Sequence, residues 1–141
     1  MSEVQLILKS HPRERRELLT VLATFAAEHH LPPSAVNAAD LALEEHLTNV
    51  INYGYDGPDS HDILVRLALV NQDFIVEVVD DGKAFNPLNR PAVDVSKPLA
   101  DRAIGGLGIH LIKQFMDAVD YSRQSGKNTL RMTKRLSAGA A

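Results

Sequence analysis

The spacing of apolar residues along this chain changes between the period of a helix and the period of a strand. In residues 12–30 and 33–53 apolar side chains recur every three or four positions, which predicts two amphipathic helices. A short β-like run, residues 4–9, precedes them. A third helix is predicted over residues 106–116, where three glycines lead into an amphipathic segment.

Four further apolar runs predict two pairs of strands. Residues 63–70 and 74–79 are joined by a short polar turn, and residues 118–123 and 128–134 flank Gly126, so each pair is expected to form a hairpin. The order is strand, two helices, two strands, long loop, helix, two strands. This order predicts an α+β fold of two layers, with helices on one face of a mixed, mainly antiparallel sheet.

The connection from Gly82 to Gly105 contains three prolines and shows no sustained period. Such a long connection is unusual inside a compact domain and is usually functional. The small-residue tail 137–141 is expected to be frayed. A length of 141 residues is typical of one domain, so we expect a single domain over residues 1–141.

Composition excludes several classes of protein. The chain has no cysteine, which rules out disulfide scaffolds, thiol nucleophiles and iron–sulfur sites. A net charge of -3 argues against direct nucleic-acid binding, and no apolar run reaches the roughly 20 residues of a membrane helix. The N-terminus lacks the basic and apolar regions of a signal peptide. We therefore expect a cytoplasmic protein that contacts neither nucleic acid nor membrane directly.

Three polar residues of the second helix, Glu45, Asn49 and Asn52, have i, i+4 and i+7 spacing and so share one face. They present a carboxylate and two amides, while leucines on the roughly opposite face are available for packing. An ordinary solvated face is the alternative interpretation. Residues 44–46, Glu-Glu-His, could suggest a metal site, but no partner ligand stands at a recognised spacing.

Two glycine-containing motifs follow the second helix. Asp80-Asp81-Gly82 ends an apolar strand where the long loop begins, and residues 105–109, Gly-Gly-Leu-Gly-Ile, open the third helix. Glycine lets the backbone approach a ligand closely, and a helix N-terminus attracts phosphate. The ordinary alternatives are a strand-to-turn signal and a hinge. The second motif is neither a Walker A loop nor the dinucleotide fingerprint, because the required lysine and third glycine are missing.

In combination, the three motifs are far more specific than any one of them. Glu-x-x-x-Asn on a helix, Asp-x-Gly after a strand and Gly-x-Gly opening a later helix resemble the N, G1 and G2 boxes of the GHKL, or Bergerat-fold, ATP-binding superfamily. Residues 43–55, 80–87 and 105–112 are similar to the anti-sigma-factor serine/threonine kinases of bacteria. The resemblance covers about residues 4 to 136.

The resemblance implies a role for each matching residue. Glu45 would be the general base, and Asn49 would ligate Mg²⁺ through its side-chain oxygen. Asp80 would accept a hydrogen bond from the exocyclic amine of adenine, and Gly82 would let the backbone pass close to the purine. Thr129 would support the aspartate. The implied ATP site is completed by Asn52, Gly105, Gly106, Leu107, Gly108 and Ile109.

The implied ATP lid covers residues 86–104. Some kinases of this family carry a basic residue just before the second glycine motif, whereas this chain has Ile104 and Gly105 there. Either Arg102 or Lys97 would then contact the phosphates. Many relatives also have glycine where Ala84 stands, which predicts a slightly stiffer turn.

The resemblance further implies an ATP-dependent protein kinase that phosphorylates a small antagonist protein with the STAS fold. Members also bind a sigma factor and are often homodimers. The length of the chain favours this branch, since a histidine kinase needs an additional dimerisation segment. The alternative is a nucleotide-dependent module that sequesters a partner without kinase activity. A structural α+β domain that binds no nucleotide is the least favoured interpretation.

Overall fold

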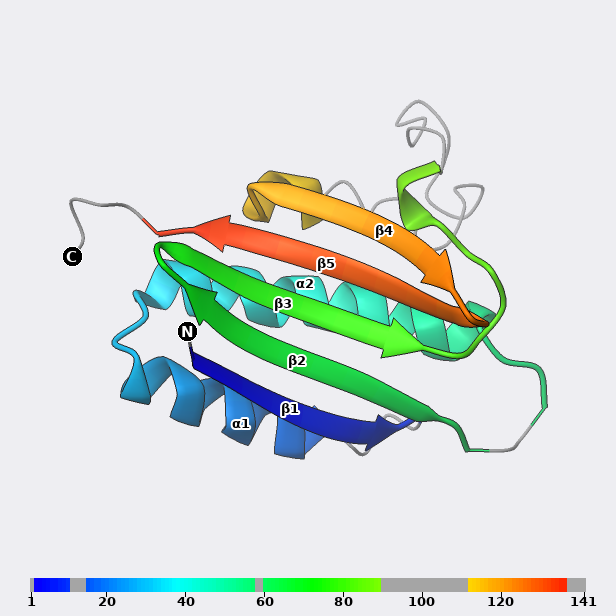
Figure 1. The fold of residues 1–141 in the computed structure, drawn as a ribbon. Coiled ribbons are helices and arrows are strands. Elements are labelled where there is room, and N and C mark those ends of the chain that lie inside the picture. The colour runs from blue at the N-terminus through cyan, green and yellow to red at the C-terminus, as the bar shows by residue number, and fades with distance from the viewer. Residues whose placement is uncertain (1, 11–14, 58–59, 90–111, 137–141) are drawn as a thin grey trace, which may run out of the picture.

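The computed structural model describes residues 2–10, 15–57, 60–89 and 112–136 as a five-stranded sheet with two long helices on one face (Figure 1). None of the helices in these ranges has the length and apolar content needed to span a bilayer. The elements are β1 (Ser2–Lys9), α1 (Arg15–Glu28), α2 (Pro33–Tyr53), β2 (Asp62–Val70), β3 (Asp73–Asp80), the short 3-10 helix η2 (Pro87–Asn89), β4 (Ala118–Gln124) and β5 (Lys127–Arg135). Residues 112–115 are also helical.

The strand order is β1-β2-β3-β5-β4. The predicted α+β class and the helices on one face are confirmed, but every neighbouring pair of described strands is antiparallel, so the expected mixed sheet is wrong in this respect. Two long helices return the chain to the edge where β1 ended, so β2 runs back beside it. β3 and β4 point the same way, but β5 lies between them (Figure 1).

The core lies between the sheet and the helices. Side chains of a strand alternate between its two faces, and in β3 the positions from Phe74 to Val78 on the helix side are fully buried. Phe74 stacks on Phe25 of α1 with 5.9 Å between ring centroids. From α2, Leu43, Leu47 and Val50 complete this layer. The opposite face of the sheet carries charged side chains, among them Arg66, which pairs with Glu3 and Glu77.

Helix α2 runs toward the sheet edge at which β3 and β4 end and β5 begins (Figure 1). It starts with proline at its first position, which is favourable because that residue's N–H has no helical partner. It ends at Gly54, whose N–H donates to the carbonyl of Val50 at 2.8 Å. The end of α2, the ends of β3 and β4 and the start of β5 therefore meet at one end of the sheet.

Candidate functional site

A cavity lies where α2 meets the ends of β3 and β5. The described residues contain four buried polar or charged side chains, those of His46, Asn49, Asp80 and Asn128, and all four line this cavity. Burying polar groups costs free energy, so their concentration in one place indicates a binding site. The lining residues are His46, Asn49, Val50, Gly54, Asp80, Lys83, Phe85, Tyr121, Asn128 and Leu130.

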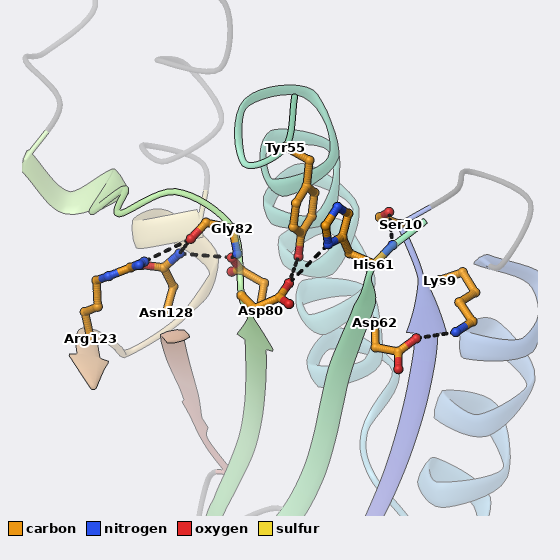
Figure 2. A network of polar contacts seen from close by, with 10 residues as sticks. Lys9, Ser10, Tyr55, His61, Asp62, Asp80, Gly82, Arg123 and Asn128 are labelled. Atoms are coloured by element: carbon orange, nitrogen blue, oxygen red, sulfur yellow. Dashed lines mark hydrogen bonds and ion pairs between the residues drawn. The ribbon is translucent and has the colours of Figure 1, made fainter. Parts of the chain in front are cut away.

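Asp80, the last residue of β3, is one of the lining residues of this cavity. Its Oδ1 accepts hydrogen bonds from the N–H of Gly82 and from Nδ2 of Asn128, both at 2.9 Å (Figure 2). Its Oδ2 accepts none from the described residues. Burial raises the pKa of Asp80, and the hydrogen bonds from Asn128 and Gly82 oppose that rise. The free oxygen is suited to a ligand that donates a hydrogen bond.

Asn128 holds Asp80 and the loop after β3 together. Besides its bond to Asp80, Nδ2 donates to the carbonyl of Lys83 at 2.8 Å. Its Oδ1 accepts from the hydroxyl of Tyr121 and from Nη1 of Arg123. The same Nη1 donates to the carbonyl of Gly82 at 3.0 Å (Figure 2). Asn128 is therefore saturated by structural contacts and fixes the direction of the Asp80 side chain.

The predicted role of Thr129 is not supported by its position. Thr129 pairs with Val79, whereas Asp80 pairs with Asn128. Because successive side chains of a strand point to opposite faces, Thr129 lies on the face away from the helices and Asn128 lies beside Asp80. The supporting residue is therefore Asn128. The sequence contained the signal, since the buried residues Leu130 and Met132 have the same parity as Asn128.

Two glycines let the end of α2 approach the exit of β3. A Cβ atom on Gly82 would lie 2.7 Å from the carbonyl oxygen of Gly54 and 3.0 Å from Oδ1 of Asp80. The N–H of Lys83 donates to that same carbonyl at 2.9 Å. Only glycine at position 82 fits this approach without displacing backbone.

The three predicted polar residues of α2 do not converge on the cavity. Asn49 is 4% exposed and lines it. Glu45 is partly exposed and Asn52 is exposed, and neither is among the lining residues. The roles of Glu45 in catalysis and of Asn49 at a metal stay predictions. Residues 105–109, Lys97, Arg102 and most of the predicted lid lie outside the described residues.

His46 also lines the cavity, although the sequence motifs assigned it no role. It is 4% exposed, and its Nδ1 has no hydrogen-bond partner in the described part of the chain. Burial lowers the pKa of His46 to about 4, so the ring is neutral at pH 7. Its spacing from Leu43, Leu47 and Val50 was the available signal, because it places His46 on the buried side of α2.

A second cluster borders the site at the start of β2. The hydroxyl of Tyr55 donates to Oδ1 of Asp81 at 2.9 Å, and its ring stacks on His61 with centroids 4.0 Å apart (Figure 2). Burial, followed by the hydrogen bond to Asp81, raises the pKa of Tyr55. The N–H of His61 donates to Oγ of Ser10, so this cluster ties the segment after α2 to β1 and β3.

The cavity chemistry fits a purine nucleotide. The free oxygen of Asp80 matches an exocyclic amine, and the amide oxygen of Asn49 is a suitable ligand for Mg²⁺. No group of three or more His, Asp or Glu side chains that could hold a metal is present in the described ranges, so Mg²⁺ would depend on the phosphates. The cavity volume is about 10 Å³, which is room for one water molecule. A purine is larger, so we expect Lys83 and Phe85 to shift on binding.

A two-layer α+β domain with this buried aspartate, helix-borne asparagine and close-packed glycine is of the GHKL ATP-binding type. The chain belongs to the family of the histidine kinase-like ATPase domain, whose model matches residues 8–134.

Among its relatives, the chain is similar to the anti-sigma F factor of Thermoanaerobacter sp. (strain X514), with 30% identity over 118 residues, 82% of this chain and 80% of that one. It is 34% identical over 100 residues to the serine-protein kinase RsbW of Halalkalibacterium halodurans, covering 68% of this chain and 60% of the relative. It is 27% identical over 93 residues to the serine/threonine-protein kinase BtrW of Bordetella bronchiseptica, covering 66% of each.

The fold is also found in solved structures. The structure of the RsbU and RsbW domains of Rv1364c from Mycobacterium tuberculosis superposes with a TM-score of 0.69 and 18% identity over 96% of this chain. This chain spans 33% of the length of that one. The histidine kinase domain of the blue-light-activated kinase of Erythrobacter litoralis EL346 gives a TM-score of 0.52 and 16% identity over 74% of this chain and 46% of that one. At these identities the likeness concerns the fold alone.

Proposed function

We propose that the chain is a single ATP-binding domain that acts as a serine/threonine protein kinase and anti-sigma regulator. It binds Mg-ATP and phosphorylates a STAS-domain antagonist, and so controls the release of a sigma factor. The observation that carries the proposal is the Oδ2 of Asp80, which no described residue hydrogen-bonds, at a cavity lined by every buried polar side chain of the described residues. The names of the relatives, an anti-sigma F factor and two serine or serine/threonine kinases, support the direction of the proposal.

Recognition of ATP begins at Asp80. Its Oδ2 accepts a hydrogen bond from the exocyclic amine of adenine, while Asn128 and the N–H of Gly82 hold Oδ1 and prevent the carboxylate from rotating. Gly82 leaves room for the purine beside the backbone. Gly106 and Gly108 supply N–H groups to the phosphates, as the glycine motif predicts.

Phosphoryl transfer itself depends on positioning and charge neutralisation. The serine or threonine oxygen of the antagonist attacks the γ-phosphorus, the bond from that phosphorus to the β–γ bridging oxygen breaks, and ADP leaves. Glu45, one helical turn before Asn49 on α2, accepts the hydroxyl proton. When bound, Mg²⁺ neutralises phosphate charge, and Asn49 is its protein ligand.

The partners follow from the same proposal. The STAS antagonist is the phosphoacceptor, and the sigma factor binds a surface of the chain rather than its cavity. The protein works in the cytoplasm, as a homodimer, without direct contact with nucleic acid or membrane. Phosphorylation of the antagonist prevents it from freeing the sigma factor.

The test is phosphotransfer from Mg-ATP to the cognate STAS protein, followed as an acidic shift on a native gel, for wild type, Glu45→Gln and the neighbouring control Glu44→Gln. Glu45→Gln keeps the side-chain volume but removes the base, so the rate is expected to fall roughly 10²–10⁴-fold with little change in ATP affinity. Glu44→Gln is expected to retain the rate. A Glu45→Gln variant as fast as wild type would refute the base assignment. ATP binding without any phosphotransfer by the wild type would favour the partner-sequestering module.

A further inference from the structure

His46 is the buried polar residue whose role neither the motifs nor the hydrogen bonds explain. Asp80 and Asn128 are bonded to each other, and Asn49 belongs to the predicted metal site. His46 is as buried as these three and lines the same cavity, yet its Nδ1 lacks a partner among the described residues. A polar atom in this situation destabilises the fold, and a leucine on this face of α2 would not. The imidazole therefore calls for a ligand-related explanation.

A purine presents hydrogen-bond acceptors as well as an amine, so its recognition requires a donor in addition to the Asp80 carboxylate. The ring nitrogens of adenine without a glycosidic bond are acceptors only, and the carboxylate of Asp80 cannot donate to them. The donors of Asn128 are directed at Asp80 and at the carbonyl of Lys83. A neutral imidazole always has one N–H donor and one acceptor nitrogen. His46 can therefore supply what Asp80 cannot.

The absence of charge on His46 matters as much as its donor. Burial keeps the imidazole neutral, since it lowers the pKa of His46 to about 4. His46 and Asp80 can then act on the same base without neutralising each other.

We propose that His46 is a second base-reading residue, whose imidazole hydrogen-bonds a ring nitrogen of adenine either directly or through one water molecule in the cavity. The inference rests on the proposed binding of an adenine nucleotide. Asp80 reads the exocyclic amine, and His46 reads the acceptor pattern of the ring.

The experiment compares wild type, His46→Leu and His46→Asn by calorimetry with ADP and with inorganic tripolyphosphate, which has no base. His46→Leu is expected to bind ADP about 5–10-fold more weakly, the usual effect of one lost hydrogen bond, with unchanged binding of tripolyphosphate. His46→Asn keeps a polar atom near the Nδ1 position and is expected to recover part of the affinity. Without ligand, His46→Leu is expected to melt no lower than wild type. Leu41→Ala is the control on the same helix, because Leu41 is exposed and does not line the cavity, and it should bind ADP and its analogues as wild type does.

The ring nitrogen is identified with 1-deaza-, 3-deaza- and 7-deaza-ADP. One analogue is expected to bind wild type more weakly than ADP but to bind His46→Leu as ADP does. The proposal is overturned if His46→Leu binds ADP like wild type, or if each analogue has the same effect on both proteins. It is also overturned, without any variant, if none of the three analogues binds wild type more weakly than ADP. Failure of the wild type to bind ADP at all would instead refute the proposed function.

Discussion

At the scale of single residues, the two oxygens of the Asp80 carboxylate have different roles, since one stabilises the fold and the other is available to a ligand. Oδ1 is held by Asn128 and by the N–H of Gly82, whereas Oδ2 accepts no hydrogen bond from the described residues. An amide in the same position would have to point its oxygen at these two donors. Its NH₂ group would then face the adenine amine, with the wrong hydrogen-bond polarity.

Asp80→Asn is therefore expected to abolish most ADP binding while leaving the fold intact. The free energy of unfolding should stay within about 1 kcal/mol of wild type, because both internal hydrogen bonds survive and a buried charge is removed. Calorimetric titration with ADP and urea unfolding, run in parallel, measure the two effects. Unchanged ADP affinity would remove Asp80 from the base site.

His46 predicts a loss of stability on acidification. Its pKa is about 6.5 in the unfolded chain and about 4 in the native protein, so below pH 6.5 the unfolded state takes up a proton that the native state does not. Stability should fall between about pH 6.5 and pH 4, by roughly 3 kcal/mol from this group, with no further loss below that range. Urea unfolding of wild type and His46→Asn across these pH values should show a shallower dependence for the variant. If the free energy of unfolding depended on pH in the same way in both proteins, the lowered pKa of His46 would be contradicted.

At the scale of elements, two glycines join α2 to the exit of β3. We expect Gly82→Ala to lower stability by about 1–3 kcal/mol and to weaken ADP binding, since the new methyl group would press on Gly54 and Asp80. Gly126→Asn is the control, because Gly126 has a φ of 75° with open space around it and asparagine tolerates that conformation. Chemical denaturation and ADP titration of both variants check this. Equal behaviour of the two variants would show that the close approach is unimportant.

The periodicity of the sequence predicted where the helices and strands lie better than which of their side chains point into the cavity. Both hairpins and α2 lie where the apolar spacing placed them. All described strands pair antiparallel because α1 and α2 bring the chain back to the end of β1. The spacing of apolar residues does not reveal this path of the chain. Motif similarity predicts Thr129 as the support of Asp80, whereas the strand pairing places Asn128 beside Asp80. The prediction that Glu45, Asn49 and Asn52 share one face of α2 was only approximate, because Asn49 alone of the three lines the cavity.

At the scale of the whole molecule, the sheet brings together residues of the site that lie far apart in the sequence. Because β3 and β4 end where β5 begins and α2 stops, a ligand in the cavity contacts several elements at once (Figure 1). Binding of the ligand should therefore raise the free energy of unfolding of the whole domain rather than stabilise one loop.

Mg-ADP at 100 times its Kd is expected to stabilise the protein by about 2.7 kcal/mol, which corresponds to a rise in Tm of roughly 8 °C. Differential scanning calorimetry over a series of ADP concentrations measures this linkage. Inorganic phosphate at the same concentrations serves as the control and should have a much smaller effect. An unchanged Tm at saturating ADP would be incompatible with a site built from these elements.

The pairing of β1 with β2 also has a consequence for the order of folding. The β2–β3 and β4–β5 hairpins close over two-residue turns, but Lys9 meets Asp62 only after both intervening helices are in place. Closing the longer loop costs more chain entropy, and non-local contacts of this kind form slowly. We therefore expect β1 to dock late, after a nucleus of the central strands and α2 has formed. Since Ser10 follows β1 and holds His61, the border of the site beside Tyr55 would be among the last parts of the protein to become ordered during folding.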